Sequence, residues 1–359
     1  MVVTIKDVAR EARVSVASVS RALNGSANVT ESTRRRILGV ATRLRYVPHT
    51  AARSLITKRT HTIGALLPDL YGEFFSELIR GIDLAARARG LHLLVSSSHG
   101  NPSEAAAALR AMQGRVDGLL IMSPYVDANL LRDHLSDSLP AVLMNTALES
   151  SRCATLNIDN FGGAYAMTRH LIDAGHRDIV FITGPVGNFD AGERLRGFRE
   201  AIRMSRNRIE VRVLDGDFTE ESGRDVGEQL LTDAQRPSAV FAANDMMAIG
   251  CLQALTEGGL RVPSDIALAG FDDIPIARFL SPPLTTVRVN IAALGRRALE
   301  QLALRLEHPE TPLTAEQQPG CEIVVRNSCS TAPAAGRTKD NWNKPKPNQT
   351  KNSYDGRRP

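Results

Sequence analysis

The chain has 359 residues, of which 43% are hydrophobic and 23% charged, so it is globular by composition and long enough for two or three packed units. Its net charge of +5 is uneven: residues 1–58 carry eleven Lys and Arg against three acids, residues 59–328 carry 26 against 34, and residues 329–359 carry seven against two. A basic N-terminal part on an acidic body is what phosphate binding by one end requires, because each neutralised phosphate releases counterions.

The same composition excludes several classes of protein. No stretch reaches the roughly 18 uninterrupted apolar residues of a membrane span, and Lys6, Asp7, Arg10 and Glu11 stand where a secretory signal would need apolar residues. We therefore expect a cytoplasmic protein, associated with the nucleoid and without contact to a membrane. Four scattered cysteines show no C-x-x-C spacing, which predicts reduced thiols rather than disulfides or a metal site. They are Cys153, Cys251, Cys321 and Cys329.

Three short helices are predicted at the N-terminus. Thr4 can begin a helix over residues 5–12, Ser15 a second over 16–23, and Thr30 a third over 31–44. Apolar residues spaced at three and four form their expected common core. These residues are Ile5, Val8, Ala9, Val14, Val19, Leu23, Val29, Ile37, Val40, Ala41 and Leu44.

The second of these helices has a polar outer face suited to a DNA major groove. Arg21 presents a fork that fits guanine O6 and N7, while Val16 and Ala17 offer methyl surface to thymine. Phosphate contacts are expected from hydroxyls and amides at helix ends, because such groups fix the register of a protein on the duplex. These candidates are Ser15, Asn24, Thr30 and Thr33. The alternative is an ordinary three-helix domain with a solvated arginine.

Residues 49–56 form a short segment compatible with a helix, followed by a linker to residue 60. An isolated helix of this length is unstable in water, so it should fold only on a dimer partner and DNA.

From residue 61 strands are predicted to alternate with helices, ending with a strand at 266–270. The strands are nearly continuous in apolar residues, which predicts parallel sheets covered by helices on both faces. Eight such units are too many for one ordinary sheet, so two sheets are expected.

Residues 329–359 contain no Leu, Ile, Val or Phe and are rich in Lys, Asn, Pro, Ser and Thr. This composition predicts disorder, and it offers no heptad for a coiled coil.

The segment Thr4–Asn24, followed by Tyr46-x-Pro48 and Ala51-Ala52-Arg53-Ser54-Leu55, closely resembles the lactose-repressor (LacI/GalR) family of bacterial transcription regulators. The resemblance extends to about residue 328 and ends in Val324–Ser328, which is similar to the last strand of that family. It implies a homodimer on a pseudo-palindromic operator, a hinge helix that folds on DNA, and Leu55 as a minor-groove wedge with Ala52 beside it. The resemblance also implies that Val16, Ala17 and Arg21 are the residues that read bases.

The resemblance also implies the domain organisation. Residues 1–48 would form the helix-turn-helix DNA-binding domain, 49–60 the hinge helix and linker, and 61–328 an effector-binding and dimerisation domain similar in fold to periplasmic sugar-binding proteins. That domain would consist of two subdomains with crossings near residues 160, 289 and 320 and a ligand cleft between them. Residues 329–359 would form the polar tail.

The resemblance also implies a set of effector contacts, each at a position of this sequence that matches a family motif. Asp69 follows the first strand, and Phe74 and Phe75 could stack on a sugar or base; the alternatives are helix capping for Asp69 and a core role for the rings. Arg194 would fork onto ligand hydroxyls or carboxylates, the alternative being a surface ion pair. Either Asn244 or Asp245 can cap the next helix, and the family pattern makes Asn244 a ligand contact. Asp272 would accept hydrogen bonds from hydroxyls or amines, and Asp273 would be a turn residue. Asn145 stands where the family often has aspartate, so chemistry carried over from sugar-binding members is open to question there.

Catalysis is not indicated. The sequence has no P-loop, no G-x-S-x-G, no H-E-x-x-H and no G-x-G-x-x-G after the first strand, and its histidines do not cluster. We therefore expect no enzyme, cofactor or metal. The resemblance implies instead a repressor of carbohydrate-metabolism genes that is controlled by a sugar or sugar-like effector. The competing hypothesis is a carbohydrate-binding or enzymatic α/β protein with an accessory helical module, for which the basic N-terminus has no evident use.

Overall fold

The computed structural model describes residues 3–23, 28–46, 59–122, 124–125, 133–135, 139–148, 153–310, 315–317 and 320–329. The chain divides into two compact units, one formed by Met1–Asn157 with Ile291–Gln318 and the other by Ile158–Asn290 with Pro319–Pro359. The chain therefore passes from one unit to the other three times. The expected disordered tail from 330 onwards lies outside the described residues.

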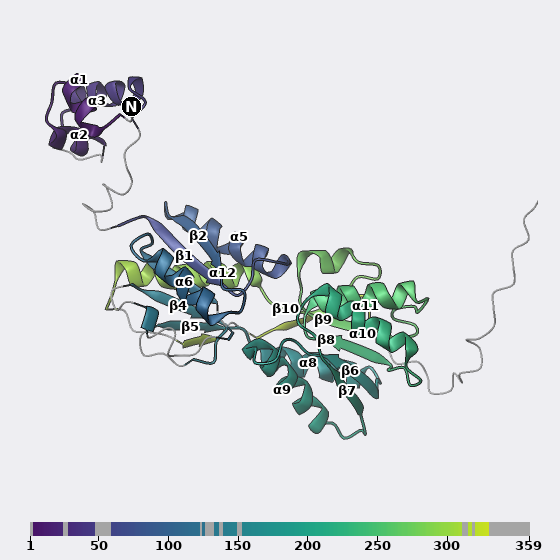
Figure 1. Cartoon of the computed structure of the whole chain (residues 1–359). Coiled ribbons are helices and arrows are strands. Elements are labelled where there is room, and N and C mark those ends of the chain that lie inside the picture. The colour runs from purple at the N-terminus through teal and green to yellow at the C-terminus, as the bar shows by residue number, and fades with distance from the viewer. Residues whose placement is uncertain are drawn as a thin grey trace, which may run out of the picture. The chain divides into compact units, whose positions relative to one another are not determined.

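Three helices form a small module at the N-terminus (Figure 1). They are α1 (Ile5–Glu11), α2 (Val16–Leu23) and α3 (Glu31–Arg43). Each begins where the sequence predicts and ends within one residue of the expected position. Every apolar residue expected in their core belongs to one hydrophobic cluster, which also includes Ala12, Ala22 and Tyr46. The periodicity of this segment was therefore sufficient to identify its core.

Local hydrogen bonds fix the starts of these helices. The Asp7 carboxylate accepts hydrogen bonds from the backbone N–H of Thr4 at 3.0 Å and from its hydroxyl at 2.7 Å. These bonds, the one from the hydroxyl first, lower the pKa of Asp7. Ser15 Oγ accepts the N–H of Ser18 at 3.1 Å, which is the expected cap of α2. Thr30 precedes α3 without a side-chain cap.

The first unit contains a six-stranded sheet in the order β11-β5-β4-β3-β1-β2, in which all neighbouring strands are parallel. Its strands are β1 (Thr62–Leu67), β2 (His92–Ser97), β3 (Gly118–Met122), β4 (Ala141–Met144), β5 (Ala154–Asn157) and β11 (Ala315–Gln317). Strand order reverses between β1 and β3, and ligands bind beyond the carboxyl ends of strands at such a point.

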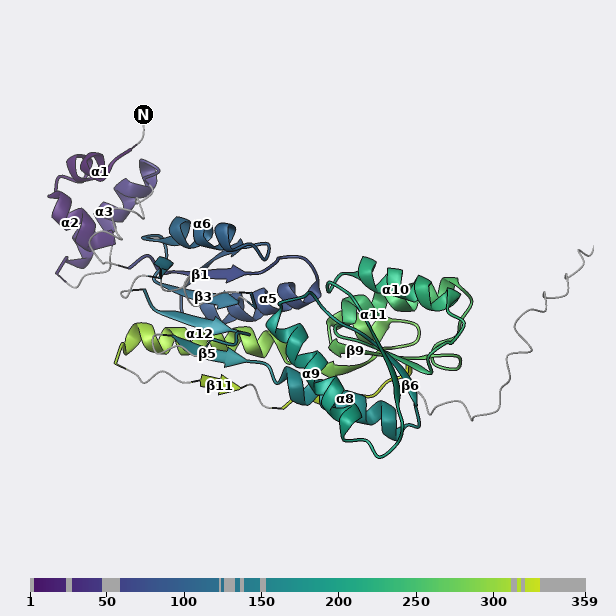
Figure 2. The same ribbon diagram turned by 60° about the horizontal axis from the view of Figure 1, so that its bottom comes forward.

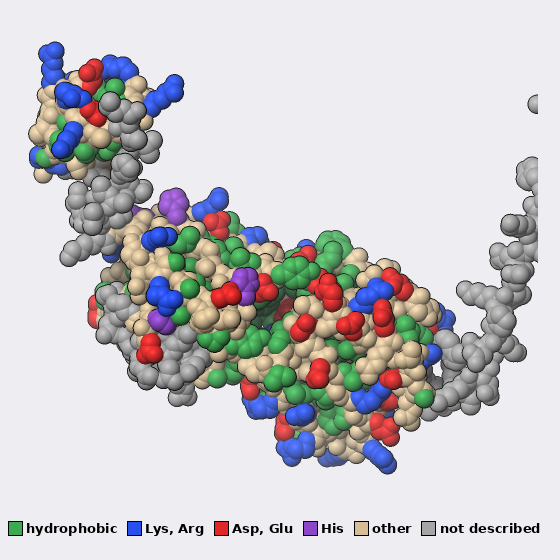
Figure 3. Space-filling view, in the orientation of Figure 1, with side chains coloured by type: hydrophobic (Ala, Val, Ile, Leu, Met, Phe, Trp, Pro, Cys, Tyr) green, Lys and Arg blue, Asp and Glu red, His purple; other side chains and the backbone are tan. Residues whose placement is uncertain are grey.

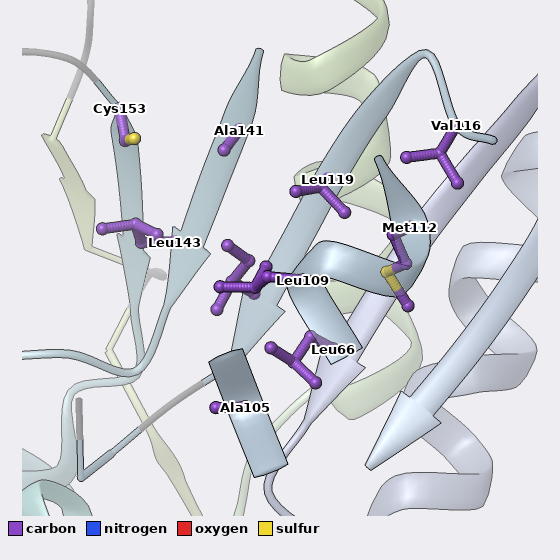
Figure 4. Close-up of a cluster of buried hydrophobic side chains, with 10 residues drawn as sticks. Leu66, Ala105, Leu109, Met112, Val116, Leu119, Ala141, Leu143 and Cys153 are labelled. Carbon is purple, nitrogen blue, oxygen red and sulfur yellow. The ribbon is translucent and has the colours of Figure 1, made fainter. Parts of the chain in front are cut away.

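Helices cover both faces of this sheet (Figure 2). They are α5 (Glu73–Arg87), α6 (Pro102–Met112) and α12 (Ile291–Glu307). Helix α6 packs on one face through a buried apolar cluster that includes Leu66, Leu109 and Leu119 (Figure 4). Helices α5 and α12 pack against each other on the opposite face.

The second unit contains another six-stranded sheet, in the order β12-β10-β9-β8-β6-β7, parallel except for the β10–β12 pair. Its strands are β6 (Asp178–Ile182), β7 (Glu210–Leu214), β8 (Ala239–Ala242), β9 (Ala267–Asp272), β10 (Thr285–Arg288) and β12 (Glu322–Val324). Its helices are α8 (Asn160–Asp173), α9 (Phe189–Arg203), α10 (Glu220–Thr232), α11 (Asp245–Glu257) and the 3-10 helix η1 (Pro275–Phe279). Helices α8 and α9 pair on one face and α10 and α11 on the other (Figures 1 and 2).

Helices α10 and α11 approach so closely that a glycine is required at their contact. A Cβ on Gly250 would lie 1.8 Å from the carbonyl oxygen of Glu220, a backbone atom that cannot move without the whole helix.

The expected fold class is confirmed: a helical N-terminal module precedes two sheets that are parallel or nearly so, covered by helices. The sequence interpretation was wrong where it closed the series of elements at the strand now seen as β9. It did not include β10 and the 17-residue helix α12, nor the short strands β5 and β11. Within the described residues, no helix is long and apolar enough to cross a membrane.

Candidate functional sites

The residues predicted to read bases all lie on the outer surface of α2. Val16 is 41% exposed, and Ala17 and Arg21 are also exposed, whereas Val19 and Ala22 of the same helix are buried. Arg21 Nε donates to the carbonyl oxygen of Ala17 at 3.2 Å, so its stem lies along the helix. The three side chains therefore share one solvent-facing surface.

Three of the four predicted phosphate contacts, Ser15, Thr30 and Thr33, lie at the N-terminal ends of α2 and α3. Ser15 Oγ is 2.9 Å from the hydroxyl of Ser18, and Thr30 Oγ1 donates to Thr33 Oγ1 at 3.0 Å. The free N–H groups of a helix start attract phosphate, and these hydroxyls lie beside them. Asn24 and the predicted hinge residues Ala52 and Leu55 lie outside the described residues.

Several basic side chains project from the visible face of this module (Figure 3). Arg10, Arg13, Arg35 and Arg36 are exposed along with Arg21. Such a surface supplies sequence-independent attraction to a polyanion, while the α2 face can supply selectivity.

In the first unit, the predicted effector residues follow the carboxyl ends of β1 and β4. Asp69 is exposed, and its Oδ1 accepts the N–H groups of Leu70 at 2.6 Å and Tyr71 at 3.1 Å. It does not cap α5, whose N-cap is Gly72, so the capping alternative is wrong. The half-buried rings of Phe74 and Phe75 meet edge to face with centroids 5.4 Å apart.

Asn145 follows β4 and is fully buried, with a left-handed φ of 49°. Its N–H donates to the carbonyl oxygen of Leu156 at 3.1 Å. Asparagine tolerates this conformation better than most residues do. Its position at the end of a strand matches the prediction.

In the second unit, Arg194 lies inside a buried polar cluster and is only 3% exposed, so the alternative of a surface ion pair is wrong. Its Nε donates to Asn160 Oδ1 at 2.8 Å and its Nη1 to the carbonyl oxygen of Ala243 at 2.6 Å. The guanidinium carbon lies 3.9 Å from the ring centroid of Phe271 and 5.7 Å from that of Phe218. Contacts on every side hold the guanidinium in one position.

Asp272 ends β9 beside this guanidinium. Arg194 Nη2 lies 3.0 Å from Asp272 Oδ1, an ion pair whose geometry leaves that oxygen without a hydrogen bond. Burial raises the pKa of Asp272 to about 6, although the Arg194 charge acts to lower it and the Asp190 charge raises it further. The result is a buried carboxylate with an acceptor oxygen still able to take a hydrogen bond.

Asn244 and Asp245 have different tasks at the start of α11. Asn244 caps the helix, since its Oδ1 accepts the N–H of Met247 at 3.0 Å, while its Nδ2 donates to the carbonyl oxygen of Phe218 at 3.0 Å. Asp245 accepts the Thr286 hydroxyl at 2.6 Å and the N–H of Ile274 at 3.0 Å. Burial, and next the charge of Asp272, raises the pKa of Asp245 well above its ordinary value.

Three members of this cluster were not identified from the sequence. Asn160 Nδ2 donates to Asp190 Oδ1 at 2.7 Å, so Asn160 links Asp190 to Arg194. Phe218 has a left-handed φ of 74°, and its ring lies against Gly184, where a Cβ would come within 2.3 Å of it. The sequence offers one indication of Asn160 and Asp190: both are polar residues in the first turn of an amphipathic helix.

Comparison with known proteins bears on both sites. Residues 4–49 match the model of bacterial regulatory proteins of the lacI family, and residues 168–329 match that of the periplasmic binding protein-like domain.

Similar proteins span nearly the whole chain. The HTH-type transcriptional repressor PurR of Edwardsiella ictaluri is 38% identical over 92% of this chain and 98% of its own length. The ribose operon repressor of Haemophilus influenzae is 35% identical over 90% of this chain and 98% of its own. A crystal structure of the lac repressor dimer bound to operator and the anti-inducer ONPF superposes with a TM-score of 0.81 at 26% identity, covering 91% of this chain and 99% of that one.

Proposed function

Because this chain belongs to the LacI family of bacterial regulatory proteins, we propose that it is a repressor that binds a pseudo-palindromic operator as a homodimer and responds to a small-molecule effector. The observation that carries the DNA part is the solvent-facing surface of α2. There Val16, Ala17 and Arg21 stand together on a module rich in exposed arginines. A side chain that forks onto guanine and two that offer methyl surface suit direct readout in a major groove.

We propose the division of labour along the chain that the sequence predicts. Residues 1–48 bind DNA, 49–60 act as hinge and linker, 61–328 bind effector and dimerise, and 329–359 form a tail. Ala52 and Leu55 are the proposed minor-groove residues of the hinge.

The effector is proposed to be a sugar or sugar-like metabolite. The Asp272 oxygen without a hydrogen bond supports this class, because a buried carboxylate oxygen can accept a hydrogen bond from a ligand hydroxyl group. The ring of Phe218 near Arg194 adds an apolar surface of the kind that packs on a sugar face. The ribose operon repressor is a relative whose name points to the same class. The proposed contacts are Asp69, Phe74, Phe75, Asn145, Arg194, Asn244 and Asp272.

The family consists of regulatory repressors, and we propose that this chain likewise has no enzymatic activity and acts in the cytoplasm on the nucleoid. The coupling between effector and operator is then a reciprocal free energy, typically about 1–3 kcal/mol in such proteins.

The test is selection of DNA by the full-length chain from a randomised duplex library, followed by affinity measurements for each single-base variant of the selected site. Arg21→Ala should cost about 1–3 kcal/mol on the selected site and relax preference at one base pair per half-site. Arg43→Ala is the matched control, because Arg43 lies on α3 in an exposed ion pair with Glu11 and should change affinity for all sequences alike. Equal loss by Arg21→Ala on every sequence would refute the readout role.

A further inference from the structure

The carboxylate of Asp117 holds the two residues at which the predicted linker enters the first sheet. Asp117 Oδ1 accepts the backbone N–H of Thr60 at 2.6 Å and the Thr60 hydroxyl at 2.8 Å. Its Oδ2 accepts the N–H of His61 at 2.8 Å. One side chain thus satisfies three donors on two consecutive residues, and bonds to a charged acceptor are stronger than those between neutral groups.

Other contacts reinforce this entry point. The N–H of Asp117 donates to the carbonyl oxygen of Thr62 at 2.7 Å, and the N–H of His92 donates to that of His61 at 2.8 Å. Arg59 Nη2 lies 3.4 Å from the carbonyl oxygen of Leu306 at the end of α12. His61 has a left-handed φ of 52°, a conformation that a non-glycine residue keeps only when its surroundings hold it.

The anchor lies at the amino end of β1, and the carboxyl end of that strand leads to the predicted effector residue Asp69. Asp117 immediately precedes β3, which pairs in parallel with β1, and β1 begins at Thr62 and leads to Asp69. Both strands are buried along almost their full length. Six residues of strand span about 20 Å, so β1 connects residues 60 and 61 directly to the segment that carries Asp69.

We propose that Asp117 is a positioning residue for DNA recognition: it fixes the point from which residues 47–58 lead to the DNA-binding module. This role rests on the proposed function. In a dimer, two such fixed points define the distance between the two modules, and that distance must match the spacing of the half-sites. Without the anchor the start of each linker is less constrained, so the dimer tolerates a wrong spacing between the half-sites.

The first measurement is hydrogen exchange of peptides covering residues 59–62 in the full-length protein. Asp117→Ala should accelerate exchange at Thr60 and His61 by about tenfold or more, since each lost hydrogen bond removes roughly that protection. Thr60→Val removes the hydroxyl bond to Asp117 and the bond that the hydroxyl accepts from the Thr62 N–H, but it leaves both backbone bonds to Asp117. It should therefore have a smaller effect on exchange at Thr60 and His61. Asp173→Asn is the control, because it breaks an exposed ion pair with Arg169 elsewhere in the chain.

The second measurement compares affinity for the selected operator with affinity for the same operator carrying one extra base pair at its centre. Asp117→Ala and Asp117→Asn should reduce this discrimination about tenfold relative to the wild type, and Asp173→Asn should leave it unchanged. A purely structural role would lower the melting temperature and weaken both complexes alike, leaving their ratio intact.

The outcomes separate this role from the function on which it rests. Two outcomes would overturn the role of Asp117 alone, provided that the wild-type chain selects DNA. One is that the Asp117 variants exchange at the wild-type rate, and the other is that they exchange faster but discriminate between the two operators as the wild type does. A wild-type chain that selects no DNA sequence would sink the proposed function and the positioning role together.

Discussion

Asp272 combines an unusual backbone with an unusual charge. Its φ is 117° and that of Asp273 is 54°, so the chain turns through two left-handed residues as β9 ends. The carboxylate of Asp273 is fixed by Arg288 Nε at 2.7 Å and Arg326 Nη2 at 2.6 Å, which hold the turn in place. Strain of this kind persists where the surroundings impose it, and it directs the Asp272 side chain toward Arg194.

The raised pKa of Asp272 gives a pH dependence of known sign. The folded value is about 6 against an ordinary 3.8, so between these values the native state retains a proton that the unfolded chain has lost. Stability therefore falls as pH rises through this window, by on the order of 3 kcal/mol at neutral pH. Asp272→Asn should raise the melting temperature at pH 7 and leave it nearly unchanged at pH 4.

Thermal melts at the two pH values check this, with Asp173→Asn as a control expected to be neutral at both. A larger loss of stability for Asp272→Asn at pH 7 than at pH 4 would mean that the ion pair with Arg194 outweighs burial.

How far the sequence predicts single residues depends on the distance between partners along the chain. The exposure of Val16, Ala17 and Arg21 on one surface follows from one helical period and is confirmed. Family motifs point to Arg194 and Asp272, but they do not predict that the two side chains are buried together. Asn160 bridges residues 30 and 34 positions away, and no local pattern contains that relation.

At the scale of elements, close helix pairs depend on single glycines. Gly250→Ala would place a methyl group against the Glu220 backbone and separate α10 from α11, so it should destabilise by about 1–3 kcal/mol or more. Gly192→Ala in α9 is the matched control, because nothing lies within 4 Å of the added Cβ. It should stabilise by about 0.5–1 kcal/mol. Urea unfolding monitored by circular dichroism compares the two; equal effects of either sign would contradict the role of the contact.

Most elements of the sheets could be read from apolar runs and helix caps. Helix α12 could also have been predicted, because its buried residues recur at helical spacing: Ile291, Leu294, Ala298 and Leu302. What no local pattern supplies is its partner: α12 follows β10 of the second sheet but packs on β3 and β4 of the first. The three- and four-residue strands β5, β11 and β12 are too short to show alternation.

At the scale of the molecule, charge and polarity are separated along the chain. The first 58 residues hold most of the positive excess, whereas the Arg194 cluster is buried. Raising salt from 50 to 200 mM should therefore weaken operator binding by ~10³–10⁵-fold if six to ten phosphates are neutralised. Effector binding should change little, since buried pairs are poorly screened. Fluorescence anisotropy and calorimetry measure the two; a salt-insensitive operator complex would contradict the assignment of the basic module.

Because the chain passes three times between the two units, the units are completed in a fixed order during synthesis on the ribosome. The first unit begins synthesis first but lacks α12 until residue 307 has emerged. The part of one sheet face that α12 covers, over β3, β4 and β5, therefore stays bare while nearly all of the second unit is made. A premature stop near residue 290 would leave a nascent chain with that apolar face bare, a substrate for chaperones and proteases. Nonsense mutations late in the gene should therefore remove the protein from the cell rather than yield a DNA-binding fragment.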